Sequence, residues 1–255
     1  MAEDGYAPGT PIWVDLSSPD PAASERFYGD LFGWTADEPD AQAGGYRMLR
    51  YDGKMVAGLG PTMNPGQPPA WMTYIKVADA SATASAAESA GGKVVMPAMD
   101  VMEAGRIAMI QDPTGGVVGL WQPGQHKGAE LFNTPVSVSW NELSTRDVES
   151  AKRFYSQVFG WEPHTSGEPG QEYTEWRVNG KSVGGMMAMP DQVPAAVPPH
   201  WLTYFAVDDC QGTVARATER GGQVMVPPMT IPQGTFSVLA DPQGAAFAVI
   251  QLNQG

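Results

Sequence analysis

Residues 27–34 read Phe-Tyr-Gly-Asp-Leu-Phe-Gly-Trp, and residues 154–161 repeat them as Phe-Tyr-Ser-Gln-Val-Phe-Gly-Trp. The same spacing relates Trp13-x-Asp15-Leu16-Ser17 to Trp140-x-Glu142-Leu143-Ser144. Three further motifs recur in the same order, namely Trp-x-Thr-Tyr (71–74 and 201–204), Gly-Gly (91–92 and 221–222) and Asp-Pro-x-Gly (112–115 and 241–244). A repeat of about 125 residues indicates a duplicated domain and not a solenoid. We predict domains at 1–124 and 134–255, joined by a linker at 125–133.

Within each half, a strand, a helix and further strands follow one another in the same order twice. A short strand (12–16 or 138–143) precedes a helix that is capped by Ser18 or Asp20 in the first half and by Thr145 or Asp147 in the second. Two strands follow, joined across Asp52-Gly53 or Asn179-Gly180, which are strong hairpin signals. A strand at 71–77 or 201–207, an Ala-rich helix and closing strands complete the half. The chain is therefore predicted to hold four strand–helix–strands modules.

Composition excludes several classes of function. The formal net charge of −13 disfavours nucleic acid and anionic membranes as partners. No apolar run is long enough to span a bilayer, and residues 1–10 do not resemble a secretion signal. The single cysteine, Cys210, permits no intrachain disulfide. We expect a cytoplasmic protein that is a monomer or a weak dimer, because the duplication already fuses two domains.

Taken together, these motifs resemble the vicinal oxygen chelate superfamily, which includes glyoxalase I, bleomycin-resistance proteins and extradiol dioxygenases. The resemblance covers nearly the whole chain and extends to two-domain glyoxalase-like proteins of actinobacteria. It implies an α+β fold of tandem domains, in which four βαβββ modules form curled mixed sheets, or cups, with helices outside. It implies function poorly, because one fold can host many chemistries.

The resemblance also places metal ligands on particular strands. Those positions fall at Trp13, Met72 and Gly119 in the first half, and at Trp140, Leu202 and Ala248 in the second. Indole, thioether and methyl groups do not replace imidazole or carboxylate as ligands of Zn, Fe or Ni. We therefore expect no metal and no cofactor.

Alternation along the strands predicts which side chains face the cups. The residues that we expect to line them and bind a ligand are Trp13, Tyr46, Met48, Arg50, Tyr74 and Trp121 in the first half, and Trp140, Arg177, His200 and Leu202 in the second. Tryptophan and tyrosine suit planar ligands, because they combine flat apolar area with a polar tip. His200 is either a proton carrier at a cup mouth or a surface histidine.

The candidate catalytic residues are Glu142 and Glu175, with Asp15 as the next choice. Two carboxyl groups on neighbouring strands would raise one pKa and allow proton transfer near neutral pH. The phenols of Tyr173 and Tyr204 could stabilise an oxyanion. The structural alternatives are ion pairs of Asp15 and Glu142 with Arg50 and Arg177, and tryptophans that serve only packing.

Three functions remain open. The leading hypothesis is a metal-independent enzyme that performs acid/base chemistry, such as dehydration, cyclisation or another lyase step, on an aromatic, oxygen-rich small molecule in natural-product biosynthesis. The second is a binding protein that sequesters a planar hydrophobic ligand, as drug-resistance proteins of the superfamily do. The third is a metal-dependent glyoxalase or dioxygenase.

Overall fold

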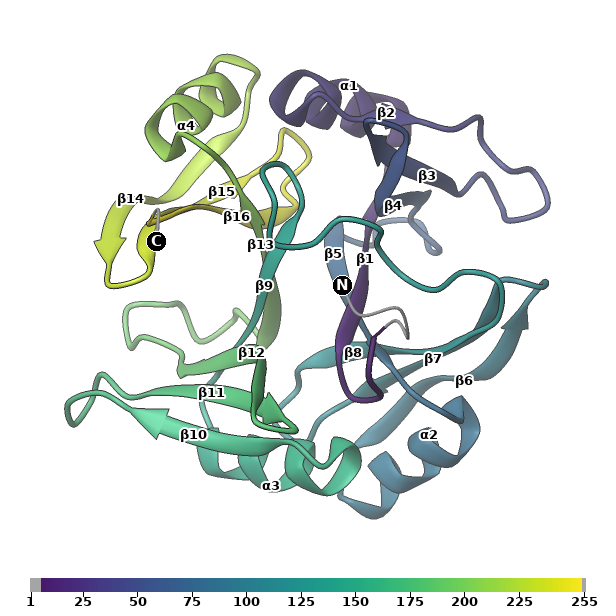
Figure 1. The fold of residues 1–255 in the computed structure, drawn as a ribbon, viewed down its shortest axis with the longest axis vertical. Helices are drawn as coiled ribbons and strands as arrows, with labels where there is room; N and C mark the ends of the chain where they lie inside the picture. Colours follow the sequence, from purple (N-terminus) through teal and green to yellow (C-terminus); the bar gives the residue numbers. More distant parts are fainter. Residues whose placement is uncertain (1–5, 254–255) are drawn as a thin grey trace. The chain divides into compact units, whose positions relative to one another are not determined.

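The computed structural model describes residues 6–253 of the chain (Figure 1). The elements of the first half are β1 (Pro11–Ser18), α1 (Pro21–Phe32), β2 (Thr35–Ala36), β3 (Arg47–Tyr51), β4 (Lys54–Pro61), β5 (Ala70–Lys76), α2 (Ala80–Ser89), β6 (Lys93–Val101), β7 (Gly105–Gln111) and β8 (Val117–Pro123). Those of the second half are β9 (Val138–Thr145), α3 (Val148–Phe159), β10 (Glu162–Ser166), β11 (Tyr173–Val178), β12 (Lys181–Ala188), β13 (His200–Ala206), α4 (Cys210–Glu219), β14 (Gln223–Ile231), β15 (Gly234–Ala240) and β16 (Ala246–Leu252).

Four βαβββ modules follow one another along the chain, as predicted. Module 1 is β1–β4 with α1, module 2 is β5–β8 with α2, module 3 is β9–β12 with α3, and module 4 is β13–β16 with α4. The strands form two mixed sheets of eight, with the orders β2-β3-β4-β1-β5-β8-β7-β6 and β10-β11-β12-β9-β13-β16-β15-β14. Neither sheet closes into a barrel, because each order ends in two different edge strands. The α+β class and the tandem architecture are confirmed.

The repeated Phe-Gly-Trp motif ends a helix in each half. Asp20 and Asp147 begin α1 and α3, each with a side-chain oxygen that accepts a backbone N–H of the first turn. Gly33 and Gly160 end these helices at φ of 74° and 68°, in the left-handed conformation that favours glycine. The aspartates, and not Ser18 or Thr145, are therefore the caps.

The predicted hairpins are also present. Asp52 and Gly53 have φ of 48° and 75°, and Asn179 and Gly180 have φ of 50° and 74°. Two successive residues with positive φ define the turn that these dipeptides favour. The short strands β2 and β10, which follow the Phe-Gly-Trp motifs, were not expected, and both lie at sheet edges.

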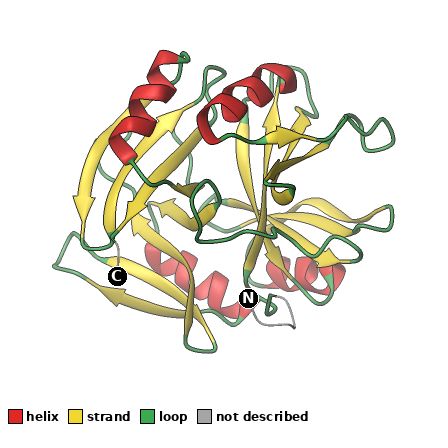
Figure 2. Cartoon of the chain, turned by 45° about the horizontal axis from the view of Figure 1, so that its top comes forward, coloured by secondary structure: helices red, strands yellow, loops and turns green. Residues whose placement is uncertain are grey.

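The hydrophobic cores divide the chain differently from the sheets. Unit 1 contains residues 6–12, 73–128 and 141–201, and unit 2 contains residues 13–72, 129–140 and 202–253. Unit 1 thus contains most of modules 2 and 3, with α2 beside α3, and unit 2 contains most of modules 1 and 4, with α1 beside α4 (Figure 1). Figure 2 shows the helices in red and the strands in yellow. Each unit has a large aromatic and aliphatic core.

Within residues 6–253, no helix is both long and apolar enough to cross a membrane.

Candidate functional site

Each sheet has a covered face, which packs against the helices, and an inner face on the other side. On β11, Thr174 and Trp176 are buried and Trp176 belongs to the helix-side core, so Tyr173, Glu175 and Arg177 point to the inner face. On β3, Leu49 belongs to the core of unit 2, which leaves Met48 and Arg50 on the inner face.

In unit 2, three of the predicted residues meet on the inner face of module 1. The indole Nε1–H of Trp13 donates to the hydroxyl of Tyr46 over 2.9 Å, and that hydroxyl donates to Oδ2 of Asp15 over 3.3 Å. Burial, and next the charge of Asp15, raise the pKa of Tyr46 well above its ordinary value, so the phenol stays protonated. The three side chains form a hydrogen-bonded chain from indole to phenol to carboxylate.

Two glycines of β4 make room for the Tyr46 ring. A Cβ on Gly58 would lie 1.7 Å from the phenol oxygen, and one on Gly60 would lie 3.1 Å from a ring carbon. Gly58 pairs with both Asp15 of β1 and Met48 of β3 in the sheet register. A glycine inside a strand often marks such a close approach, and here the approaching group is the protein's own phenol.

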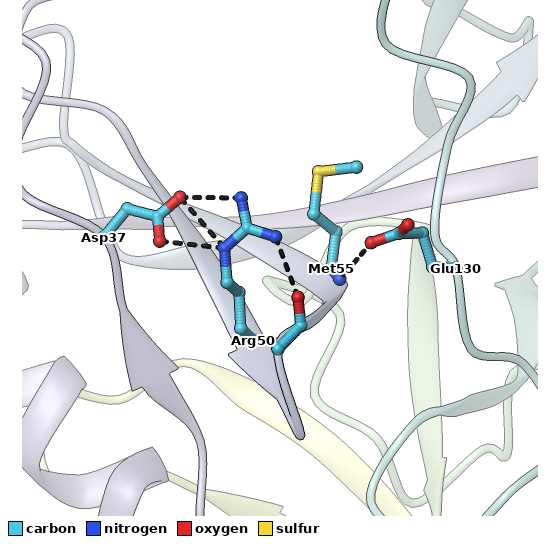
Figure 3. Close-up of polar contacts among 5 residues, drawn as sticks. Asp37, Arg50, Met55 and Glu130 are labelled. Atoms are coloured by element: carbon cyan, nitrogen blue, oxygen red, sulfur yellow. Dashed lines mark hydrogen bonds and ion pairs between the residues drawn. The ribbon is translucent and has the colours of Figure 1, made fainter.

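Arg50 forms its ion pair with Asp37 and not with Asp15. Its Nε donates to Asp37 Oδ1 at 2.8 Å, its Nη2 to Oδ2 at 2.9 Å, and its Nη1 to the carbonyl of Gly53 at 3.1 Å (Figure 3). The ion pair of Arg50 is thus made with Asp37, just after β2, and not with Asp15. Figure 3 also shows Glu130, which accepts the backbone N–H of Met55 at 2.7 Å.

In unit 1, Glu142 and Glu175 lie in one row of the second sheet. Gly185 of β12 pairs with Glu175 of β11 on one side and with Glu142 of β9 on the other. The prediction that the two acids occupy neighbouring strands is therefore wrong, because β12 runs between them. Paired residues share a face, so both carboxylates are on the inner face, about 10 Å apart at the backbone.

The two acids have different surroundings. Glu142 is buried, with 8 % of its surface exposed. Glu175 accepts three hydrogen bonds at Oε2, from Ser182 Oγ at 2.8 Å, Arg177 Nη2 at 3.0 Å and Arg177 Nε at 3.3 Å. The Ser182 hydroxyl and then Arg177 hold the pKa of Glu175 below its usual range. Arg177 is thus the ion-pair partner of Glu175. Tyr173, two residues before Glu175 on β11, pairs with Met187 of β12.

The other predicted residues of unit 1 lie in module 2 and at the start of β13. Tyr74 lies over Gly119, where an added Cβ would be 2.2 Å from its ring. Trp121 donates its indole N–H to the carbonyl of His126 at 3.0 Å. His200 is half-buried, and its Nδ1 is 2.9 Å from the carbonyl oxygen of Pro198.

In unit 2, the inner face of module 4 is apolar. Leu202 and Tyr204 form a cluster with Ala248 and Ile250, against which Trp140 packs. The ring centroids of Tyr204 and Phe236 are 6.0 Å apart. The four residues of the cluster are buried and pack against one another.

Three functional candidates were missed by the sequence analysis. Ser182 donates to Glu175, Asp37 is the ion-pair partner of Arg50, and His164 of β10 pairs with Glu175 in the register. Position 164 is equivalent to position 37, so comparing the repeats residue by residue would have revealed the exchange of aspartate for histidine.

The described residues do not fit a metal centre. Within 6–253, no group of three His, Cys, Asp or Glu side chains could hold a metal ion. The ring of Tyr74 covers Gly119, one of the positions that the resemblance assigned to a ligand. Glycine at this position offers neither imidazole nor carboxylate.

The chain belongs to the glyoxalase/bleomycin resistance protein/dioxygenase superfamily, whose model matches residues 11–119 and again residues 137–249. It is 45 % identical over 255 residues to CFP32 of Mycobacterium tuberculosis, which is named provisionally as a glyoxylase, and the match covers 96 % of both chains. It is 41 % identical over 265 residues to the anthracycline biosynthesis protein DnrV of Streptomyces peucetius, covering 98 % of this chain and 96 % of DnrV.

A solved structure shares the fold at low identity. The Mn(II)-bound glyoxalase from Novosphingobium aromaticivorans has a TM-score of 0.65 and 17 % identity, over 96 % of this chain and 85 % of that chain. Such identity supports the architecture and says nothing about the reaction. The resemblance inferred from the repeated motifs is confirmed.

Proposed function

We propose that this protein is a metal-independent enzyme that performs acid/base chemistry on an aromatic, oxygen-rich small molecule, with Glu142 as the proton-transfer group. The reaction class would be dehydration, cyclisation or another lyase step in natural-product biosynthesis. The observation that carries the proposal is a buried carboxylate on the inner face of the second sheet, next to a strand position without a side chain, Gly185.

Burial suits Glu142 to this role because proton transfer needs a carboxylate that is shielded from water and within hydrogen-bond reach of the ligand. Gly185, the partner of Glu142 in the strand register, is buried as well. Glu175 suits it less, because Ser182 and Arg177 lower its pKa and keep it ionised. We therefore assign proton transfer to Glu142 and ligand binding to Glu175.

The relatives support the substrate class. DnrV and DauV, both named as anthracycline biosynthesis proteins, match nearly the full length of the chain at 41 % and 40 % identity. A natural-product pathway that builds aromatic compounds therefore fits the proposal. A metal-dependent glyoxalase or dioxygenase reaction is not proposed, because the residues at the expected ligand positions carry no imidazole or carboxylate.

A binding protein is the second candidate. It is favoured by the apolar inner face of module 4, where Leu202, Tyr204, Ala248 and Ile250 cluster. Such a face retains a flat ligand without any proton transfer.

The test begins with small molecules that co-purify with the protein, identified by mass spectrometry and then assayed for turnover. Glu142→Gln should reduce turnover by a factor of about 10²–10⁴ while affinity changes less. Glu149→Gln, on the exposed side of α3, is the matched control and should change nothing. Turnover should also survive chelation.

Full turnover in Glu142→Gln would remove that residue from the mechanism. Loss of activity on chelation, restored by added metal, would contradict metal independence. Retention of a ligand that is never converted, together with its loss in Trp140→Ala, would favour the binding protein.

A further inference from the structure

The outer hairpin of the first sheet, formed by β6 and β7, carries three methionines that the proposed function does not use (Figure 1). Met96 of β6 pairs with Met109 of β7, and Met99 of β6 pairs with Ile107 of β7. Met96 and Met109 are half-buried, and Met99 is 52 % exposed. The three thioethers therefore belong to two adjacent rows of one hairpin.

A β-bulge brings the three side chains to one face. On β7, Ala108 and Ile110 belong to the helix-side core, so the residues that alternate with them, among them Met109, point to the inner face. Residues three apart on a regular strand point to opposite faces. The register is shifted between Met96 and Met99, however, and both pair with inner-face residues of β7. All three methionines thus lie on the inner face.

The strand register sets the spacing between these side chains. Residues directly opposite each other in an antiparallel pair have Cβ atoms about 4.5–5.5 Å apart, and diagonal neighbours are about 7–8 Å apart. Met96 is opposite Met109, and Met99 is diagonal to Met109. Methionine is unbranched and has three rotatable side-chain bonds, so the three sulfurs can reach one ion from these positions.

Thioether sulfur favours a particular class of ion. It is a soft ligand of the kind that selects Cu(I), whereas carboxylate and carbonyl oxygens suit Mg, Ca and Mn. It carries no proton to lose, whereas a thiol must be deprotonated and an imidazole must be neutral before either binds a metal. The formal net charge of −13 also favours a cation over an anion.

The second repeat keeps the backbone geometry but lacks two of the sulfurs. Val226 of β14 pairs with Val238 of β15, and a register shift again separates Val226 from Met229. Met229 is equivalent to Met99, and its exposure of 51 % is nearly the same. Valines therefore stand where the first repeat has its other two methionines, and the protein contains its own control for the effect of exposure.

We propose that Met96, Met99 and Met109 form a binding site for a soft monovalent cation, Cu(I), on the β6–β7 hairpin. The three neutral sulfurs coordinate the ion without losing a proton. The site is independent of the proposed function, because its residues take no part in the proton transfer assigned to Glu142. Ion binding and turnover are therefore tested separately.

Methyl NMR tests the site with Ag(I), which has the charge and the filled d shell of Cu(I) and needs no reductant. Protein labelled with carbon-13 at the methionine methyl groups is titrated with silver nitrate in a chloride-free buffer at about pH 5, where a thiol is protonated. Burial raises the pKa of the Cys210 thiol, so the low pH suppresses binding there. The methyl resonances of Met96, Met99 and Met109 should shift together and saturate at one equivalent of Ag(I), while that of Met229 stays unshifted.

Single variants assign the resonances and separate a site from exposed sulfur. Met99→Leu keeps the size and apolar character of the side chain. It should weaken Ag(I) binding at Met96 and Met109 by at least about tenfold, because even the loss of an outer-shell partner costs about 10–100-fold in metal affinity. Met229→Leu is the matched control and should leave the affinity unchanged.

The second repeat also allows a gain of binding. Val226→Met combined with Val238→Met places three thioethers on the β14–β15 hairpin. This double variant should raise the stoichiometry from one Ag(I) to two, and the resonance of Met229 should now shift. Circular dichroism establishes that each variant is folded before it is titrated.

Equal shifts of Met99 and Met229 in the wild-type protein would overturn the proposal, because they would show that Ag(I) binds any exposed methionine. Unchanged binding at Met96 and Met109 in Met99→Leu would overturn it too. Cu(I), supplied with ascorbate under anaerobic conditions, should shift the same three resonances, and its failure to do so would show that the assigned ion is wrong.

Discussion

The hydroxyl of Tyr155 donates to Oδ2 of Asp112 over 2.8 Å, so the second repeat's Phe-Tyr motif is joined to the first repeat's Asp-Pro-x-Gly turn in the core of unit 1. The mirror contact in unit 2 runs from Tyr28 to Asp241 over 3.2 Å. In each unit the tryptophan of the Trp-x-Thr-Tyr motif donates to the same tyrosine, from Trp201 or Trp71 at 3.0 Å. Three of the duplicated motifs are thus one hydrogen-bonded network, which is formed twice.

Tyr155→Phe should destabilise the protein by about 1–3 kcal/mol, because it leaves a buried carboxylate oxygen and a buried indole N–H without their partner. Tyr28→Phe should cost less, since its hydrogen bond to aspartate is longer. Urea denaturation measures both losses. Tyr51→Phe is the control and should stay within about 0.5 kcal/mol of wild type. A Tyr155→Phe variant as stable as this control would contradict the role given to the network.

The two halves of the chain should depend on each other for folding. Both compact units draw on residues before and after the linker, and both networks join the two repeats. Residues 1–128 and 129–255, expressed separately, should each expose a core face and unfold or self-associate, and the two should associate when co-expressed. Co-purification through a tag on one half, followed by size-exclusion chromatography, tests this. Two separately stable monomeric halves would refute it.

Stability should fall at alkaline pH. Burial, and next a neighbouring aspartate, raise the pKa of Tyr28, Tyr46 and Tyr155 well above the ordinary value of 10.0. The unfolded chain therefore loses these protons first, so the stabilisation is complete below the unfolded pKa and is lost as pH rises toward the folded values. Each tyrosine should contribute a slope of about 1.4 kcal/mol per pH unit. Urea midpoints between about pH 9 and 11 measure this decline, and Tyr155→Phe should make it shallower. A flat profile would count against the burial of these phenols.

The sequence predicted the elements and faces because those depend on local patterns. Hydrophobic alternation placed Glu175 and Arg177 on the inner face, and the Asn179-Gly180 dipeptide fixed the hairpin beside them. Their contact with Ser182 depends on a register shift between Trp176 and Arg177, which no alternation rule predicts. Asp37 was missed as the partner of Arg50 because β2 has two residues and no periodicity.

The sequence also could not predict which modules share a core. Both repeats carry the same tyrosine, tryptophan and aspartate motifs, so Tyr28 could have met Asp112 or Asp241 with equal chemistry. Only the three-dimensional arrangement of the duplicated parts distinguishes the two. Likewise, the pattern gave Glu142 and Glu175 one face but not the strand between them, because strand order in a mixed sheet is not encoded by local alternation.

Gly58 should not tolerate even a methyl group while Tyr46 lies against it. A Cβ there would be 1.7 Å from the phenol oxygen and 2.4 Å from Cζ, so the ring would have to leave and lose its hydrogen bonds to Trp13 and Asp15. Gly58→Ala should therefore cost about 1–3 kcal/mol in wild type. In a Tyr46→Ala background only the 3.0 Å approach to Asp15 Cβ remains, so the same change should cost clearly less, and the restriction that alanine places on the unfolded chain offsets part of that cost. Gly60→Ala, with 3.1 Å to the ring, is the milder control. A double-mutant cycle by urea denaturation gives the coupling between Gly58 and Tyr46, and a coupling near zero would show that the ring does not rest on the strand.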